Sequence, residues 1–330
     1  MATVIDVARQ AGVSIATVSR VLNGNASVGS EMGERVRTAV KELDFRPNHI
    51  AQGLRKGHTN TVALLVGDIA QTHLAELTMQ VQAALEKVGI HTLLFNAGHS
   101  EMRLADFLAL ALSMRLRGVA IALSDTIPKS VAPQLAQLED HGIQVVSIGQ
   151  NLTRYGIPSI IHEERAAAQR SVGYLLDKGH RRIAFIGRIK GSAVGTERFR
   201  GYRAALSKAD AFDPALVWDR TFRYAAGHAA VQQALDAGLR FTAIQASSDE
   251  MAMGALSALR DRGLKVPKDV AVIGFGDVQM SAYLRPALTT LSSSAERAAR
   301  HVCDLLTGSA EVPASGLTQL ERRLVLRHSA

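Results

Sequence analysis

The chain has 330 residues and a net charge of +8 at neutral pH. Its length suits two or three domains, and 47% hydrophobic with 21% charged residues excludes a mostly disordered protein. The single cysteine, Cys303, excludes a disulfide framework and a CxxC metal site. Because no signal-peptide pattern and no apolar run of about 18 residues occur, we expect a cytoplasmic protein without a membrane span.

The N-terminal part is the most densely basic, since residues 1–58 hold eight lysines and arginines against five acidic residues. Its apolar spacing predicts three short helices, capped by Thr3, Ser14 and Ser30, the third covering about 31–43. We therefore expect a small helical domain at 1–46. Residues 47–58 form a linker whose helical spacing covers about seven residues, too few for a stable isolated helix.

From residue 61 the pattern changes to short apolar runs that alternate with helical stretches. The runs are TVALLVG (61–67), HTLLFN (91–96), GVAIAL (118–123), IQVVSI (143–148), RIAFIG (182–187), TAIQAS (242–247) and VAVIGF (270–275), with a last strand-like segment at 321–329. Such strands indicate parallel sheets covered by helices on both faces. Seven units exceed one doubly wound sheet, so we predict an α/β core of two lobes over 59–330.

Residues 4–23, VIDVARQAGVSIATVSRVLN, have the layout of a helix-turn-helix. The second helix would enter the major groove, where Arg20 suits a guanine and Ile15 and Ala16 suit a thymine methyl group. Short polar side chains nearby are candidates for phosphate contacts: Thr3, Ser14, Thr17, Ser19 and Asn23. On this pattern alone an ordinary helical hairpin is an equal alternative.

Residues 2–57 closely resemble the headpiece of the LacI/GalR repressor family, through VIDVARQAGVSIATVSRVLNG and FRPNHIAQGLRKG. The resemblance continues in order through GHRRIAFIG, RFRGYRAAL, SDEMAMGAL, VPKDVAVIGF and PALTTL. It implies a helix-turn-helix headpiece joined to a two-lobed core like that of periplasmic binding proteins. It also implies a transcription regulator, most simply a repressor, that binds a pseudo-palindromic operator as a homodimer and needs no cofactor or metal.

The same resemblance gives the linker a role as a hinge helix in the minor groove of DNA. The family's intercalating leucine matches Leu54, and Asn48 and Arg55 are the accompanying candidates. An apolar wedge of this kind bends the duplex and so enlarges its contact with protein. Gly53 is a departure from the family pattern, because glycine lowers the helix propensity next to Leu54. The alternative role for Leu54 is a buried contact between domains.

The family's core binds a small effector between its lobes, near the carboxyl ends of the parallel strands. By resemblance the chain crosses near 158–162, 289–293 and 319–322, which gives an N-lobe of about 59–159 and 291–320 and a C-lobe of about 160–290 and 321–330. The candidate effector residues are His73, Arg188, Lys190, Arg198, Phe222, Ser248 and Gly276. Structural roles compete for several of them: a salt bridge for Arg198, the core for Phe222, and helix starts for His73 and Ser248.

Two departures from the family bear on the effector. Gly276 stands where many members that bind neutral sugars or purines have an aspartate, and GFGD looks like the gluconate-responsive branch. With no carboxylate there, bare backbone N–H groups could serve an anion, and Asp277 is expected to point away. In IIHEERAAAQ (160–169), His162-Glu163-Glu164 replaces an aspartate-asparagine pair. We expect a gluconate-like sugar acid, with a phosphorylated or neutral sugar as the alternative.

Functions of other classes find less support. The stretch GRIKGSAVGT lacks the order of a phosphate-binding loop, and the chain has no HExxH or GxSxG motif, so we expect no enzyme. A transport-type sugar-binding protein would carry a signal peptide and no basic headpiece. The pattern does not decide whether the effector loosens or tightens DNA binding, and the missing heptad tail favours a dimer.

Overall fold

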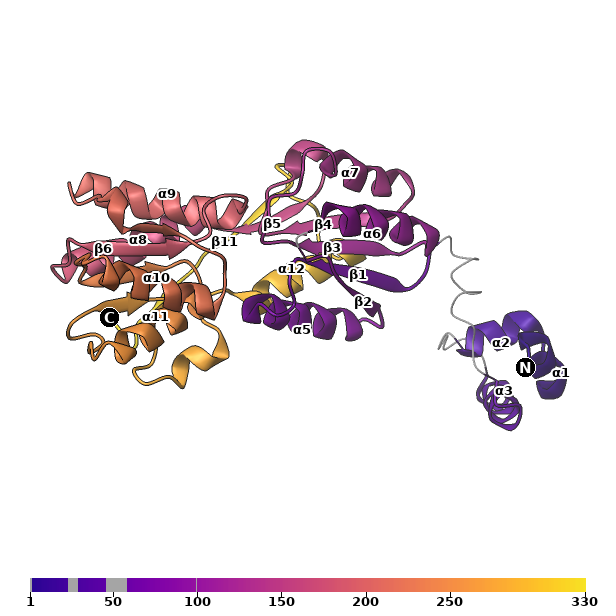
Figure 1. The fold of residues 1–330 in the computed structure, drawn as a ribbon. Helices are drawn as coiled ribbons and strands as arrows, with labels where there is room; N and C mark the ends of the chain where they lie inside the picture. Colours follow the sequence, from indigo (N-terminus) through magenta and orange to yellow (C-terminus); the bar gives the residue numbers. More distant parts are fainter. Residues whose placement is uncertain (1, 23–28, 46–57, 99) are drawn as a thin grey trace. The chain divides into compact units, whose positions relative to one another are not determined.

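The computed structural model describes residues 2–22, 29–45, 58–98 and 100–330. They form two compact units, Met1–Thr59 and Asn60–Ala330, each with its own hydrophobic core (Figure 1). The predicted DNA contacts Asn23, Asn48, Leu54 and Arg55 lie outside the described residues. In the described part, no helix combines the length and apolar character that crossing a membrane requires.

The first unit consists of α1 (Val4–Ala11), α2 (Ile15–Leu22) and α3 (Ser30–Glu42). Its core is built from the apolar positions that helical spacing places on one face, namely Val7, Ala8, Ala11, Val18, Val36 and Ala39. Thr3 and Asp6 form a capping box at the start of α1, as expected of Thr3. The predicted cap of the third helix was wrong by one residue, because Gly29 occupies the cap position and Ser30 begins the helix.

The turn between α1 and α2 is held by a side chain from α3. Gly12 has a φ of 62°, in the left-handed region that favours glycine. The Arg35 Nη2 atom donates to the carbonyl oxygens of Ala11, at 2.6 Å, and of Gly12, at 3.3 Å. Arg35 thereby satisfies carbonyl groups at the end of α1 and ties the turn to the third helix.

The N-lobe of the second unit contains a six-stranded parallel sheet in the order β11-β5-β4-β3-β1-β2. Its strands are β1 (Thr61–Val66), β2 (His91–Asn96), β3 (Gly118–Ala122), β4 (Gln144–Ile148), β5 (Ser159–His162) and β11 (Leu317–Leu320). Helices α5 (Thr72–Glu86) and α12 (Ala295–Thr307) pack on one face, where Val62 and Leu64 point. Helices α6 (Glu101–Ser113) and α7 (Ala132–Asp140) cover the other face, where Ala63 and Leu65 point.

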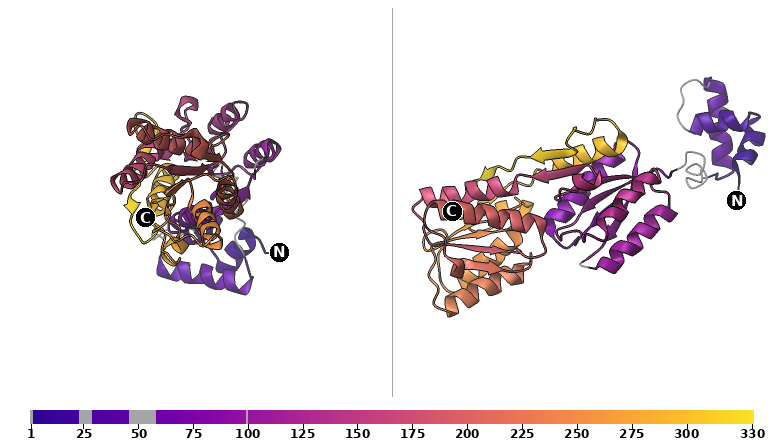
Figure 2. Two further views of the ribbon diagram at one scale, coloured as in Figure 1. Left: turned by 60° about the vertical axis from the view of Figure 1, so that its left-hand side comes forward. Right: turned by 90° about the horizontal axis from the view of Figure 1, so that it is seen from above.

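The C-lobe contains a four-stranded parallel sheet in the order β7-β6-β8-β9. The strands are β6 (Ile183–Gly187), β7 (Val217–Asp219), β8 (Ala243–Ala246) and β9 (Ala271–Ile273). Helices α8 (Glu164–Asp177) and α9 (Ala193–Lys208) cover one face, and α10 (Tyr224–Asp236) and α11 (Asp249–Asp261) cover the other (Figure 2). Short 3₁₀ helices lie at Thr153–Tyr155, Pro214–Leu216 and Gln279–Ala282.

Three extended segments carry the chain between the lobes. Strand β5 leads into α8, β10 (Thr290–Leu291) leads into α12, and β11 leads into β12 (Leu324–Val325), which pairs antiparallel with β10. Because β5 pairs within the N-lobe sheet, the first crossing follows His162, slightly later than expected. The predicted strand at 321–329 is reduced to β12, because its ladder with β10 extends over only two residue pairs, Thr290–Val325 and Leu291–Leu324.

Candidate functional site

The N-terminal part of α2 presents the side chains expected to read DNA bases. Ile15 is 42% exposed, and Ala16 and Arg20 are exposed as well. Val18, on the opposite side of the helix, is fully buried in the core of the first unit. The packing of Val18 therefore fixes which face of α2 is free, and that face carries the three side chains expected to read bases in the major groove.

The expected phosphate contacts are partly committed to capping their own helices. The Thr3 hydroxyl donates to Asp6 at 2.7 Å, and the Thr17 N–H donates to Ser14 Oγ at 3.1 Å. The Ser14 and Thr17 hydroxyls also hydrogen-bond each other at 2.9 Å. Ser14 thus caps α2, as the spacing predicted, and its hydroxyl would have to share this role with any phosphate contact.

A pocket lies between the lobes of the second unit, at the carboxyl ends of the parallel strands. Its polar lining comes from both lobes and from the crossing segments: His73, Ser124, His162, Glu164, Arg198, Ser293 and Arg322. Its apolar lining includes Leu74, Leu77, Ile148, Val194 and Ala298. The lining therefore offers partners both for charged or hydroxyl groups and for hydrocarbon groups, the combination expected of a small-molecule site.

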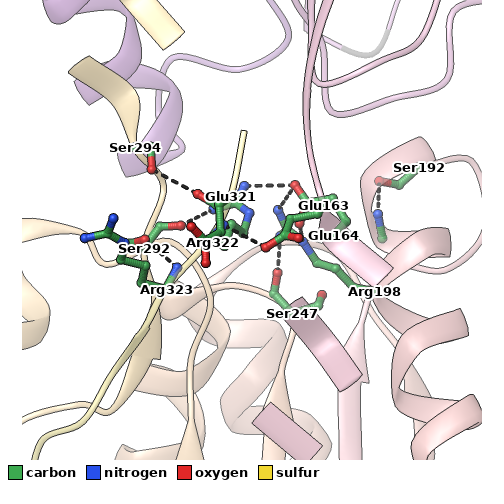
Figure 3. A network of polar contacts seen from close by, with 11 residues as sticks. Glu163, Glu164, Ser192, Arg198, Ser247, Ser292, Ser294, Glu321, Arg322 and Arg323 are labelled. Atoms are coloured by element: carbon green, nitrogen blue, oxygen red, sulfur yellow. Dashed lines mark hydrogen bonds and ion pairs between the residues drawn. The ribbon is translucent and has the colours of Figure 1, made fainter. Parts of the chain in front are cut away.

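Glu164, one of the polar lining residues, lies between two arginines (Figure 3). Its Oε2 atom accepts from Arg198 Nε at 2.9 Å, and its Oε1 atom accepts from Arg198 Nη2 at 3.1 Å and from Arg322 Nη2 at 2.8 Å. Both guanidinium groups also lie over the ring of Phe275, at 4.0 Å for Arg198 and 5.0 Å for Arg322. All three charged side chains are at most 7% exposed.

Burial and neighbouring charges set the protonation of the lining groups. Burial alone would raise the pKa of Glu164, but Arg198 and Arg322 hold it well below its usual range, so the carboxylate stays ionised. Burial, reinforced by the two arginines, lowers the pKa of His73 to about 3, and burial with Arg322 lowers that of His162 to about 3. Both histidines are therefore neutral at neutral pH, and His73 can support an acid only as a neutral hydrogen-bonding group.

The pocket brings together only some of the expected effector residues. His73 and Arg198 line it. Phe222 is 5% exposed and packs in the core of the C-lobe, while Ser248 caps α11 by accepting from the Met251 N–H at 3.2 Å. Lys190 is exposed and is not among the lining residues. The roles of these residues in effector binding stay predictions.

The surroundings of Gly276 correct part of the argument for an anion there. Its φ is 139°, a conformation that favours glycine whatever the ligand. Its N–H donates to the Leu291 carbonyl oxygen at 2.7 Å and is not bare, and a Cβ atom at Gly276 would lie 3.4 Å from Asp249 Oδ2. A carboxylate therefore remains close to this position. Asp277 does point away, since its Oδ1 pairs with Arg327 Nη2 at 2.7 Å.

Polar contacts outside the pocket join the two lobes. Arg188 pairs with Asp125 and Arg223 pairs with Asp68. In addition, the Thr72 N–H at the start of α5 donates to Glu250 Oε1 at 2.6 Å. Arg188, an expected effector residue, thus bridges the lobes beside the pocket and is not part of its lining. These contacts hold the lobes together over the pocket.

The sequence interpretation missed Arg322, Ser124 and Ser293 as lining residues. Arg322 carried a usable signal, since it lies in the charged run Glu321-Arg322-Arg323 within a predicted crossing at 319–322. The sequence marks Glu164 and His162 as a departure from the family, without indicating a partner for Glu164. A partner 158 residues away in the chain could be identified only in the folded structure.

Comparisons with known proteins place both units in one family. Residues 3–48 match "Bacterial regulatory proteins, lacI family", and residues 172–330 match "Periplasmic binding protein-like domain". Catabolite control protein A from Priestia megaterium is 30% identical over 331 residues, 99% of this chain and 98% of that protein. The structure of a transcriptional regulator CelR–cellobiose complex is 31% identical, with a TM-score of 0.72 and 100% coverage of both chains.

The fold agrees with a further solved structure, that of the lac repressor dimer bound to operator and the anti-inducer ONPF. That structure aligns with a TM-score of 0.87 over 99% of this chain and 98% of its own chain. Because the sequence identity is 24%, this similarity supports the fold only. The predicted fold class, a helix-turn-helix unit with a periplasmic-binding-protein-like α/β core, is thereby confirmed. The relatives are transcription regulators, which agrees with the expectation that the chain is not an enzyme.

Proposed function

This chain belongs to the lacI family of bacterial regulatory proteins, and on that premise we propose that it is a repressor that binds a pseudo-palindromic operator as a homodimer under the control of a small sugar acid. The observation that carries the proposal is the exposed face of α2, where Ile15, Ala16 and Arg20 stand free while Val18 anchors the helix. A transport-type sugar-binding protein would not need a helical DNA-binding unit.

The DNA-binding part is tested by selecting operator sequences from random duplexes with the full chain. We expect two related half-sites with inverted symmetry, because each subunit of a two-fold dimer reads one half-site. Enrichment of an asymmetric single site, or no enrichment, would refute the proposal. Affinity for the selected operator should fall steeply with salt, as phosphate contacts release counterions.

The hinge belongs to this proposal through the family resemblance. Leu54 would be the minor-groove wedge, with Asn48 and Arg55 beside it, all outside the described residues. We expect Leu54→Ala to weaken operator binding in an anisotropy titration while thermal unfolding of the core stays unchanged. Unchanged operator affinity would remove Leu54 from the proposed contact.

A homodimer is supported by the similar structure of the lac repressor, which was solved as a dimer bound to operator. Each subunit of such a dimer would place one headpiece on one half-site. Light scattering of the full chain should give twice the mass of one chain, and a monomer at micromolar concentration would contradict this.

The sugar-acid effector is supported by the two arginines that line the pocket against one glutamate. Arg198 is the proposed anchor of the acid, and a phosphorylated or neutral sugar is the alternative effector. A thermal-shift screen of the full chain should raise the melting temperature with aldonates, since a ligand bound only to the folded state stabilises it. If only neutral sugars raised the melting temperature, the proposal of a sugar-acid effector would be refuted, and the proposal of a DNA-binding regulator would be unaffected.

Coupling between effector and DNA would run through the lobes. The Asp125–Arg188 and Asp68–Arg223 ion pairs join the lobes in the present arrangement, so a ligand that changes their spacing shifts a two-state core. Measuring operator affinity with and without the acid decides whether the ligand loosens or tightens DNA binding. Equal affinities in both conditions would exclude the acid as an effector.

A further inference from the structure

The side chains that line the inter-lobe pocket do not balance in charge. The ionisable groups in its described lining are Arg198, Arg322, Glu164, His73 and His162. Both histidines are neutral at neutral pH because burial holds their pKa at about 3. Two cations and one anion remain, so the lining carries one unbalanced positive charge in a region shielded from water.

Glu164 is already paired with the two arginines and is therefore not available to bind a ligand. Its two oxygen atoms accept three hydrogen bonds from the arginines, at 2.8, 2.9 and 3.1 Å. Each arginine is held from the other side as well, since Arg198 Nη1 donates to the Ser247 carbonyl oxygen at 2.5 Å and Arg322 Nη1 donates to that of Ser292 at 2.8 Å. The positions of the charges are therefore set before any ligand arrives.

Two polar atoms of the lining residues lack a partner. Arg322 Nε and His162 Nε2 are both buried and have no hydrogen-bond partner among the residues that the structure describes. Buried polar atoms are almost always paired, so an unpaired guanidinium N–H and an unpaired imidazole nitrogen on two residues of one pocket lining indicate positions that a ligand completes. A carboxylate oxygen would accept from Arg322 Nε, and a hydroxyl group suits the neutral His162, because a hydroxyl both donates and accepts.

Asp249, an acidic neighbour of Arg322, is occupied by donors outside the pocket. Asp249 does not line the pocket; its carboxylate accepts from the Val278 N–H and from the hydroxyls of Ser281 and Thr290. Burial raises the pKa of Asp249, although the donors that bind its carboxylate act in the opposite direction. Because Asp249 is bound by donors of its own and does not line the pocket, the charge count of the lining is unchanged.

We propose that Arg322 together with Arg198 holds the acid group of the effector, and that Glu164 limits the pocket to a monoanion, a hydroxycarboxylate, in preference to a phosphate monoester or a neutral sugar. The inference rests on the proposed function in taking the inter-lobe pocket as the effector site. It adds a second anchoring arginine and a residue that sets the ligand's charge.

A phosphate monoester is disfavoured by its second charge. Like phosphoserine, it carries about −1.5 to −2 charges at neutral pH. One charge would find the excess cation and the other would be buried uncompensated. Proton uptake by His73 or His162 could balance it, but their low pKa makes that unfavourable. A neutral sugar would leave the excess positive charge buried without a counter-ion.

The test is calorimetry on the full chain with gluconate, glucose 6-phosphate and glucose. The variants are Glu164→Gln, Arg322→Gln and the double variant that combines them, with Arg262→Gln in the exposed pair with Asp236 as the matched control. For the wild type and the control we expect gluconate to bind at least tenfold more tightly than the other two ligands. Glu164→Gln should raise the affinity for glucose 6-phosphate relative to gluconate by at least tenfold.

The double variant separates anchoring from net charge. It keeps one unbalanced positive charge, on Arg198, but lacks Arg322 Nε, so gluconate should stay at least tenfold weaker than in the wild type, as in Arg322→Gln. Wild-type gluconate affinity in Arg322→Gln overturns the proposal, as does tight binding of glucose 6-phosphate by the wild type. So does the absence of binding by every member of an aldonate and hexuronate panel at millimolar concentration.

Folding and function are checked separately. Melting temperatures show whether each variant folds; should Glu164→Gln not fold, wild type, Arg322→Gln and the double variant still decide the question. Operator binding is an independent measurement. A chain that binds its operator but ignores the charge of the ligand overturns this inference alone, whereas selective binding of gluconate without any operator binding overturns the proposed function.

Discussion

Replacing Gly12 with alanine should disable the DNA-binding unit and leave the effector core intact. At a φ of 62° an L-residue is strained by roughly 1–2 kcal/mol. The new Cβ atom would also lie 2.5 Å from Arg35 Nη2, which donates to the Ala11 and Gly12 carbonyl oxygens. Displacing the guanidinium forfeits charged hydrogen bonds worth about 1.5–3 kcal/mol, so the total is about 2.5–5 kcal/mol.

That loss is large for a unit of this size, whose stability is on the order of 3–9 kcal/mol. Differential scanning calorimetry of the full chain should show the headpiece transition lowered by more than about 10 °C and the core transition unchanged. Operator affinity, measured by anisotropy, should fall because α2 loses its fixed position. Binding of an effector to the second unit should be unaffected.

Two other glycines serve as controls for the separate contributions. Gly89 has a φ of 73°, and a Cβ atom added there would meet no other atom within 4 Å, so Gly89→Ala should cost only the backbone strain. Gly33 lies inside α3 with Arg37 Nη2 3.4 Å from the place of an added Cβ atom, and Gly33→Ala should stabilise the headpiece by about 0.5–1 kcal/mol. If Gly12→Ala leaves headpiece melting and operator affinity unchanged, Arg35 does not hold the turn as described.

Three further outcomes are expected. Arg20→Ala should lower operator affinity by about 1–3 kcal/mol and relax the preference at one guanine, as binding to a panel of operator variants will show; an equal loss on every sequence would point to a phosphate contact instead. His73 and His162 have a pKa of about 3 when folded against an ordinary value of 6.5, so the unfolded chain binds more protons below pH 6.5. Their contribution to stability is present above pH 6.5 and is lost as the pH falls toward 3; urea midpoints at pH 7.5 and 5.5 check this, and His162→Asn should reduce the difference. Tyr202→Phe removes a buried 2.7 Å hydrogen bond to the Ile183 carbonyl and should destabilise the core by about 1–3 kcal/mol in urea unfolding, whereas no loss would mean that water replaces the hydroxyl.

Patterns along the chain were enough to predict the helices of the headpiece, most strands of the core and a two-lobed α/β arrangement, and the family resemblance added the helix-turn-helix and the periplasmic-binding-protein-like core. Local physical chemistry suffices for the helices: helical spacing puts their apolar residues on one face, and the capping side chains Thr3 and Ser14 marked helix starts. The apolar strands were recognisable because sheets covered on both faces need continuous apolar runs. The face of α2 that carries Arg20 followed from the same periodicity.

The charge of the pocket, by contrast, became visible only once the chain was folded. Glu164 and Arg322 are 158 residues apart, and each alone could have been an ordinary surface residue. Gly276 had a plausible role as a site for an anion until the fold showed its amide bonded to Leu291 and Asp249 beside it. Spacing along the chain specifies helices and strands, whereas the balance of buried charges depends on which crossing segments meet, and that is settled when the two lobes pack together.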